Sequence, residues 1–428
     1  MGFYMKRSFL AFILIFIFLF SACGETPADT TGTDAPTSDE ITIGEITTSN
    51  ETAEEETEEV TEEIKDSVTS PVPVEPEKRT TFLAAGDNII YYGTVRDAQS
   101  MAVKGGRKYN FKPIYSNVTD MIKNADVSFI NQETLMCGEG YELTWYPQFN
   151  SPQELGHDLY ELGFDVICIA NNHMLDKGSK GLNRTIEFYD TLPVMMIGGY
   201  KNEEDYRNIR IYEQNGVKIA FLAYTEFTNL KATKGYDTYI PYLENADLEA
   251  EVKAARESAD VVIASVHWGN ENKMKYNDFQ KEYAQKLADA GVDVILGHHP
   301  HVIQPVEWLE GKNGNKTLCY YSLGNFMAEQ ARDYNMLGGI VTFDIVTGGE
   351  RDGAVIENAL FTPTVFDFTR KFYNNKVYLL ENYTAEQAKN HGIGYYGNSA
   401  SLKKFREYVS NTIDTQFLPE SYISSLEK

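Results

Sequence analysis

Cysteine is scarce in this sequence, with 4 residues among 428. Cys23 lies directly after an apolar N-terminal run, whereas Cys137, Cys168 and Cys319 are far apart in the chain. An odd number of distant cysteines argues against a disulfide framework and against a zinc knuckle. Cys168 lies inside an apolar stretch, where we expect it to act as a small core side chain.

Basic residues are also few, with 38 Lys and Arg against 63 Asp and Glu and a formal net charge of -25. More than half of this negative charge falls in residues 24–79, a segment rich in Thr, Glu, Ser and Pro. Such a composition offers too little apolar surface to offset chain entropy, so we expect a disordered acidic stalk. The rest of the chain is only mildly acidic, and its charge balance does not suggest nucleic acid as a partner.

Long apolar runs are nearly absent, apart from Phe9 to Phe20, which follows a basic start and precedes Ser21-Ala22-Cys23. A membrane-spanning helix needs roughly twenty residues, so this run is too short for one and is typical of a secretory signal over residues 1–23. Its end resembles a bacterial lipoprotein signal, in which Cys23 becomes the lipidated first residue and anchors the product to the outer face of the cell membrane. The alternative is an ordinary signal peptide with an incidental cysteine.

The remaining residues, 80–428, are predicted to form one large α/β domain. Apolar runs alternate with helical patterns, which is typical of a mostly parallel sheet covered on both faces. Strands are expected near residues 81–88, 126–134, 164–170, 193–197, 217–224, 260–266 and 292–296. Helices are expected near residues 112–124, 178–190, 246–258, 277–290 and 401–412. A further helix is expected to begin at Ser151 with a serine cap and a proline in the first turn.

Beyond residue 301 the pattern changes to short apolar runs separated by turn residues. These runs cover residues 303–309, 317–321, 339–346, 353–361 and 376–380. They predict antiparallel strands, which either form a second sheet or extend the first.

Polar side chains follow the predicted strands at the points where the strands end. They are Asp87, Glu133, Asn172, His173, His267, His299 and His301. Because the carboxyl ends of parallel strands meet at one edge of a sheet, we expect these side chains to converge. Carboxylates and imidazoles suit Mn, Fe or Zn, and a carboxylate can bridge two ions.

The histidine cluster at residues 298–301 is the densest part of this pattern. Gly297 is expected to permit a turn there and Pro300 to stiffen it, so that His299 and His301 reach one ion or two adjacent ions. A surface loop that happens to be rich in histidine is the alternative.

The strand ends carry six short motifs. These are Gly86-Asp87, Asn131-Gln132-Glu133-Thr134, Asn171-Asn172-His173-Met174-Leu175-Asp176, His267-Trp268-Gly269, Gly297-His298-His299-Pro300-His301 and Tyr321-Ser322-Leu323-Gly324-Asn325-Phe326. In this order they resemble the CapA family, the poly-γ-glutamate capsule synthesis proteins, over about residues 81–344, with a C-terminal extension to residue 428. That family is similar to the calcineurin-like metallophosphoesterases, so the resemblance implies a four-layer sandwich of two mixed β-sheets flanked by helices.

The resemblance also implies a role for each strand-end residue. The implied ligands of one or two divalent ions, Mn, Fe or Zn, are Asp87, Glu133, Asn172, His267, His299 and His301. Asp87 matches the first-metal aspartate, and Glu133 stands where the phosphoesterases have a bridging aspartate. Two positions depart from the phosphoesterase pattern: Ile89 replaces a histidine, and Glu133 is one methylene longer than an aspartate.

The chemistry implied is hydrolysis. Water activated by the cation attacks a phosphoryl, amide or ester centre while His173 protonates the leaving atom. Asp176 either orients His173 or caps the helix that follows Gly178. Side chains expected to line the pocket are Asn88, Asn131, Trp268 and Asn325.

These observations predict an extracytoplasmic, membrane-anchored CapA-type protein of capsule, poly-γ-glutamate or cell-wall polymer biosynthesis, acting through a metal-dependent hydrolytic site. Its expected partners are an anionic cell-surface polymer, or the machinery that makes and exports it, and the membrane. One alternative is a metal-dependent phosphoesterase or peptidase unrelated to capsule. Another is a binding protein in which the metal is only structural.

Overall fold

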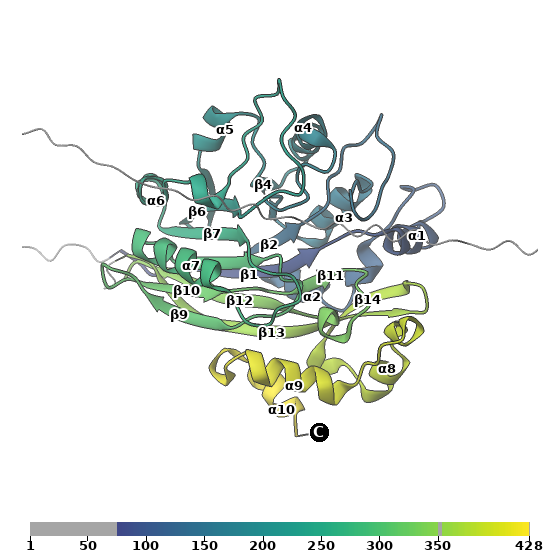
Figure 1. Ribbon diagram of the computed structural model, residues 1–428. Helices are drawn as coiled ribbons and strands as arrows, with labels where there is room; N and C mark the ends of the chain where they lie inside the picture. Colours follow the sequence, from purple (N-terminus) through teal and green to yellow (C-terminus); the bar gives the residue numbers. More distant parts are fainter. Residues whose placement is uncertain (1–74, 350–352, 428) are drawn as a thin grey trace, which may run out of the picture. The chain divides into compact units, whose positions relative to one another are not determined.

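The computed structural model describes residues 75–349 and 353–427. The predicted signal peptide with Cys23, and the predicted stalk up to residue 74, lie outside these residues. The described chain forms two mixed β-sheets flanked by helices, so the fold class implied by the family resemblance is confirmed (Figure 1). Within residues 75–349 and 353–427, no helix combines the length and apolar character needed to cross a membrane.

The first sheet has the strand order β14-β13-β12-β1-β2-β3-β4, and β11 pairs with the end of β1. Its parallel strands are β1 (Lys78–Asn88), β2 (Val127–Gln132), β3 (Val166–Cys168), β4 (Met195–Ile197) and β11 (Asn325–Met327). Its antiparallel strands are β12 (Leu337–Thr347), β13 (Val355–Thr369) and β14 (Tyr373–Leu379). The predicted strands beyond residue 337 therefore extend the sheet that begins with β1.

The second sheet has the order β5-β6-β7-β8-β10-β9. Its strands are β5 (Arg210–Gln214), β6 (Val217–Thr225), β7 (Val261–His267), β8 (Val294–His298), β9 (Val306–Glu310) and β10 (Lys316–Tyr320). The strands β6, β7, β8 and β10 are parallel, so the prediction of one mostly parallel sheet is wrong. An apolar run is the same whether helices cover both faces of a strand or a second sheet covers one of them.

The two sheets pack face to face through alternate residues of their strands. In β6, Ile219 and Phe221 join the core cluster shared with the first sheet, whereas Ala220 and Leu222 join the cluster beneath the helices α6 (Leu248–Arg256) and α7 (Asp278–Ala290). The rings of Phe82 and Phe221 are 6.1 Å apart across the interface. Burial of a side chain of this size stabilises the fold by about 2 kcal/mol.

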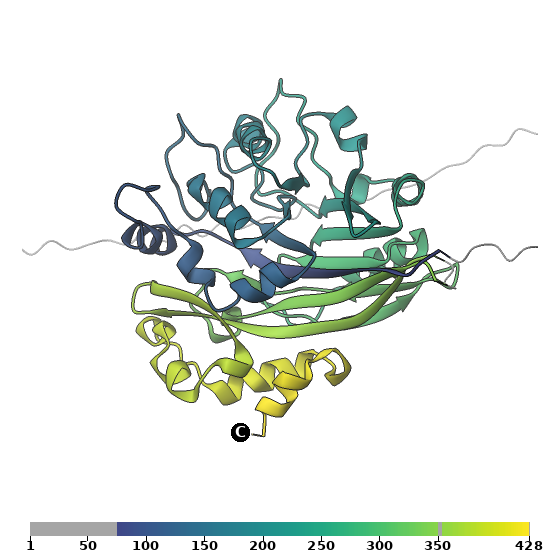
Figure 2. The ribbon, with the colours of Figure 1, turned by 180° about the vertical axis from the view of Figure 1, so that it is seen from behind.

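The other helices are α1 (Tyr92–Ser100), α2 (Thr119–Asn124), α3 (Glu154–Leu162), α4 (Gly178–Tyr189), α5 (Glu203–Arg207), α8 (Ala385–Asn390), α9 (Leu402–Thr412) and α10 (Glu420–Ser425). Figures 1 and 2 show α8 to α10 gathered below the first sheet, beside β13. The predicted helix over residues 112–124 is two pieces, a 3-10 turn at Lys112–Tyr115 and α2. Ser151 does not cap α3, because its hydroxyl lies 2.7 Å from that of Thr134 and no side chain caps that helix.

Candidate metal centre

The candidate metal centre lies where strands of both sheets end. Asp87 lies near the end of β1 and Glu133 directly follows β2, whereas His267 ends β7. His299 and His301 follow β8. Each sheet therefore contributes two strand ends, as expected for ligands at the carboxyl ends of parallel strands.

The backbone after β8 is strained at the histidines themselves. His299 has φ 97° and His301 has φ 57°, a left-handed conformation that bulky residues rarely adopt. The prediction that Gly297 permits this turn is wrong, because Gly297 lies inside β8, where a Cβ would lie 2.0 Å from the carbonyl oxygen of Tyr321. Strain of this kind persists only where the surrounding structure holds it, and it concentrates at functional sites.

Asp87 is the most closely contacted carboxylate of the centre. The amide of Asn131 donates to its Oδ1 at 2.8 Å, Nδ1 of His298 lies 3.3 Å from Oδ1, and Nδ1 of His301 lies 3.0 Å from Oδ2. Burial alone would raise the pKa of Asp87, but the contacts with His298 and His301 outweigh it and hold that pKa well below its usual range. Asp87 is therefore an ionised, fully buried carboxylate.

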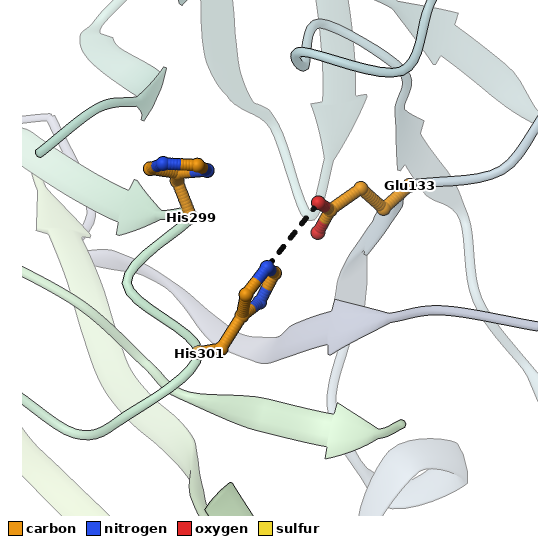
Figure 3. A group of neighbouring side chains, drawn as sticks. All are labelled: Glu133, His299 and His301. Atoms are coloured by element: carbon orange, nitrogen blue, oxygen red, sulfur yellow. Dashed lines mark ion pairs between the residues drawn. The ribbon is translucent and has the colours of Figure 1, made fainter. Parts of the chain in front are cut away.

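Glu133 is the second buried carboxylate of the centre. Among the described residues, neither of its side-chain oxygens accepts a hydrogen bond, although Oε1 lies 3.7 Å from Nε2 of both His267 and His301. Figure 3 shows the carboxylate of Glu133 and the ring of His301 pointing toward each other. Burial, reinforced by the negative charge of Asp87, raises the pKa of Glu133 well above its usual value. Buried polar atoms are normally paired, so this carboxylate needs a partner, and a bound cation would be one.

The imidazoles of His267 and His299 are suited to metal binding. Nε2 of His267 lies 3.1 Å from Nδ1 of His299 and 3.0 Å from Oδ1 of Asn172. Burial lowers the pKa of His267 well below its usual value and that of His299 to about 3, and neighbouring imidazoles add to both effects. Both rings are therefore neutral at pH 7, which is the form that coordinates metals.

His301 differs from these two histidines in charge. Burial lowers its pKa, but the carboxylates of Glu133 and Asp87 outweigh burial and raise the pKa to about 9. Positive charge is thus stabilised between the two carboxylates, and a bound cation would supply that charge in place of the ring proton, because His301 coordinates a metal only in its neutral form.

Two groups of side chains have the spacing of metal ligands. One consists of Glu133, His299 and His301, and the other of Asp87, Glu133 and His267, with the ligand atoms of each group within 4.8 Å of one another. Glu133 belongs to both groups, which is the arrangement of a bridging ligand. Carboxylate and imidazole donors of this kind fit a divalent ion such as Mn, Fe or Zn.

His173 lies beside the ligand groups and is held by Asp176. Nδ1 of His173 is 2.8 Å from Oδ2 of Asp176, which also accepts the backbone N–H of Phe149 at 2.6 Å. The alternative role of Asp176 as a helix cap is not observed, because Lys177 precedes α4 and no side chain caps that helix. Asp176 therefore fixes the ring of His173, as an outer partner of a functional histidine does.

Of the four residues predicted to line the pocket, two contact residues of the metal centre and two have partners elsewhere in the fold. Asn131 donates to Asp87, and Asn325 donates to the backbone oxygen of His301 at 3.3 Å, so both support the centre. Asn88 is used in a buried network with Gln132 and Tyr115. Trp268 packs in the core cluster beneath α7, and its place in a pocket wall stays a prediction.

The structure also places at the centre His298, to which the sequence assigned no role, and Asn229, which the sequence did not identify. His298 shares a strand face with Val294 and Leu296, which faces the first sheet, and this alternation along β8 could have identified it. Asn229 contacts Asn172 and His173 from a loop without periodic pattern, so no signal pointed to it.

The sequence of this chain is similar to those of known proteins. A family model described as bacterial capsule synthesis protein PGA_cap matches residues 81–330. The chain is 32% identical over 197 residues to the PGA biosynthesis protein CapA of Bacillus subtilis, covering 45% of this chain and 50% of that protein. It is 30% identical over 270 residues to the capsule biosynthesis protein CapA of Bacillus anthracis, covering 61% of this chain and 62% of that protein.

More distant similarities were also found. A probable polyglutamine synthesis accessory protein of Mycobacterium tuberculosis is 24% identical over 237 residues, covering 51% of this chain and 58% of that protein. The structure of an NAD nucleotidase from Haemophilus influenzae aligns with TM-score 0.40 and 12% identity, covering 82% of this chain and 60% of that one. The chain thus spans between half and two thirds of the length of the CapA proteins that it matches. Because the family model covers more than half of the sequence, this chain belongs to the bacterial capsule synthesis protein PGA_cap family.

Proposed function

We propose that this chain is an extracytoplasmic, lipid-anchored protein of capsule or poly-γ-glutamate assembly that hydrolyses a bond in an anionic cell-surface polymer at a metal centre. Family membership and the names of the CapA relatives support the capsule role. The observation that carries the hydrolytic part is the fully buried Glu133 carboxylate, without a donor among the described residues, beside the imidazoles of three separate positions.

Each residue of the centre has a distinct part in this proposal. The ion would be held by six side chains, those of Asp87, Glu133, Asn172, His267, His299 and His301. A bound divalent ion supplies Lewis-acid activation of a water molecule and of the reacting oxygen. His173, whose Nδ1 is held by Asp176, presents its other ring nitrogen as the proton donor to the leaving atom.

Location on the outer face of the cell membrane would bring this centre to its polymer. The support is the short apolar run that ends at Cys23 and the acidic segment that follows it. Cys23→Ser is expected to release the protein from the membrane fraction. A variant that stays in the membrane fraction would contradict the lipid anchor.

The hydrolytic function is tested by turnover of polyglutamate and of a small phosphodiester with added Mn²⁺. His173→Ala is expected to lower the rate by about 10²- to 10⁴-fold, the usual contribution of a positioned proton donor, while metal content is unchanged. His157→Ala, at a histidine of α3 that packs against Phe188, is the matched control and should keep the rate. Metal binding without turnover of either substrate would leave a non-catalytic binding protein as the function.

A further inference from the structure

A strip of exposed and half-buried aromatic and basic side chains lies outside the metal centre. Its members, here called the aromatic strip, are Tyr92, Trp145, Tyr373, Tyr395, Arg96 and Arg370. Tyr92, Tyr373 and Tyr395 are 56%, 40% and 47% exposed. Adjoining exposed aromatic rings are uncommon on soluble domains and mark surfaces that bind another molecule.

Four members of the strip, Trp145, Tyr92, Arg96 and Tyr373, contact one another in turn. The ring of Tyr92 lies 5.6 Å from that of Trp145. The guanidinium of Arg96 lies 5.6 Å from the ring centroid of Tyr92 and 3.7 Å from that of Tyr373. The guanidinium of Arg96 therefore joins α1 to the β13–β14 turn within one continuous surface.

One end of the strip leads to the metal centre. Tyr91, the neighbour of Tyr92 in the chain, meets the edge of Phe149 with ring centroids 5.0 Å apart. Phe149 in turn meets His173 at 4.7 Å. The chain step from Tyr92 to Tyr91, followed by two aromatic contacts, thus connects the strip to the proposed proton donor.

The other end of the strip is positively charged. The guanidinium of Arg370 lies 4.4 Å from the ring centroid of Tyr395, and Lys371 is exposed beside it. Interaction with Arg370, and then the charge of Lys371, lowers the pKa of the exposed Tyr395 phenol. Positive potential is therefore concentrated at this turn, in a chain whose formal net charge is -25.

The turn that carries these charges is held in place. Lys371, Phe372 and Asn374 have positive φ values of 62°, 55° and 54°. The buried carboxylate of Asp97 on α1 accepts the backbone N–H groups of Asn374 and Asn375 at 3.1 and 2.8 Å. Non-glycine residues keep such conformations only where other contacts enforce them, and these cluster at binding and active sites.

We propose that the aromatic strip binds an extended polymer chain that carries anionic groups and guides it to the metal centre. The rings offer flat faces to the backbone of such a chain, and Arg370 with its neighbour Lys371 pairs with the anionic groups. A small substrate would need only the centre itself. The inference rests on the proposed function in that it identifies how the polymer reaches the same site.

Binding of labelled polyglutamate to the full chain at pH 7 tests the strip. The double variant Arg370→Gln/Lys371→Gln should weaken binding by about tenfold, because each exposed ion pair contributes at most modestly. Lys253→Gln/Lys286→Gln makes the same change of charge on α6 and α7, away from α1 and β14 in Figure 1, and should bind as the unmodified chain does. Tyr92→Ala/Tyr395→Ala should also weaken binding by about tenfold, and this loss should persist at high salt, since ring contacts are not screened.

The proposed role of the strip would be contradicted if Arg370→Gln/Lys371→Gln bound polyglutamate as well as the unmodified chain does. Tight binding of the neutral glycan dextran, or no binding of polyglutamate, would also contradict it. Hydrolysis of a small phosphodiester by the unmodified chain is measured separately. Hydrolysis without polymer binding contradicts the strip alone, and polymer binding without any hydrolysis contradicts the proposed hydrolytic function alone.

Discussion

Nδ1 of His301 lies 3.0 Å from Oδ2 of Asp87, although 214 positions separate the two residues in the chain. Asp87 belongs to the first sheet and His301 follows a strand of the second. The contact therefore depends on how the two sheets pack, and each side of the centre is incomplete without the other. Substitutions that leave the sheets intact can separate metal binding from folding.

Removal of either partner should abolish metal binding. Loss of an outer-shell partner commonly costs about 10- to 100-fold in metal affinity, so loss of a direct ligand in Asp87→Asn or His301→Ala should cost more. Metal content of the purified chain, measured after dialysis against Mn²⁺, checks this. Added Mn²⁺ should raise the melting temperature of the unmodified chain and of neither variant, because a ligand that binds only the folded state stabilises it.

His157→Ala is the control for this experiment, since His157 lies on α3 and contacts Phe188. It should bind metal as the unmodified chain does. Full metal content in both Asp87→Asn and His301→Ala, with the fold intact, would mean that the ion is bound elsewhere.

Asp176→Asn should lower kcat by about 10- to 100-fold with little effect on KM. Oδ2 of Asp176 faces both the N–H of Phe149 and Nδ1 of His173, so the amide oxygen can keep both contacts, but the negative charge beside the ring is lost. A ring that donates from Nε2 while Nδ1–H faces residue 176 carries both protons, and a neutral amide stabilises that charged ring less than a carboxylate does, so fewer rings could protonate the leaving atom. Steady-state kinetics of the variant measure the effect. Asp190→Asn, which removes only the exposed pairing with Lys201, should match the unmodified chain.

Much of the candidate site could be predicted because one regularity governs it: parallel strands place their carboxyl ends together. Asp87, Glu133 and His267 were identified as strand-end residues, and the structure brings them within ligand distance. Their roles as metal ligands stay predictions. The sequence left two roles open for Asp176, orienting His173 or capping the next helix, and the 2.8 Å contact with Nδ1 of His173 favours the first.

Other features had no signal in the sequence. Apolar strands look alike in one sheet or in two, so the division of the parallel strands followed only from the family resemblance. The left-handed conformations of His299 and His301 were missed because a glycine and a proline nearby suggested a simpler turn. The contact of Arg96 with Tyr373 joins residues 277 positions apart and has no local pattern.

Gly297→Ala should destabilise the chain by at least about 3 kcal/mol, more than overpacking of a side chain usually costs. The added Cβ would meet the backbone oxygen of Tyr321 at 2.0 Å, so β8 and the end of β10 must move apart. Urea denaturation measures the loss. Gly394→Ala is the control, because its Cβ would have no neighbour within 4 Å and its effect should stay within about 0.5 kcal/mol. Equal stability of the two variants would contradict the close approach of these strands.

The buried His391 and the half-buried Asp367 form a pair whose responses to acid oppose each other. Nε2 of His391 lies 3.7 Å from Oδ1 of Asp367. Burial raises the pKa of Asp367 to about 6, although a backbone N–H and the facing Tyr383 lower it. Burial lowers the pKa of His391 to about 4, although its hydrogen bond to the carbonyl of Phe366 acts against this.

The signs of the two contributions follow from proton binding. Between about pH 4 and 6 folded Asp367 holds a proton that the unfolded chain has released, so acid stabilises the fold through Asp367. Between about pH 6.5 and 4 unfolded His391 binds a proton that the folded chain excludes, so acid destabilises the fold through His391. Between pH 7 and 4.5 each contribution is about 2 kcal/mol, and the two nearly cancel.

Asp367→Asn should therefore lose about 2 kcal/mol more than the unmodified chain when the pH falls from 7 to 4.5, and His391→Gln should lose about 2 kcal/mol less. Urea denaturation at both pH values measures these differences, in which the contributions of all other groups cancel. The double variant should return to the pH dependence of the unmodified chain, because both titrations are then removed. The same pH dependence in all four proteins would show that these two groups titrate alike in the folded and unfolded chain.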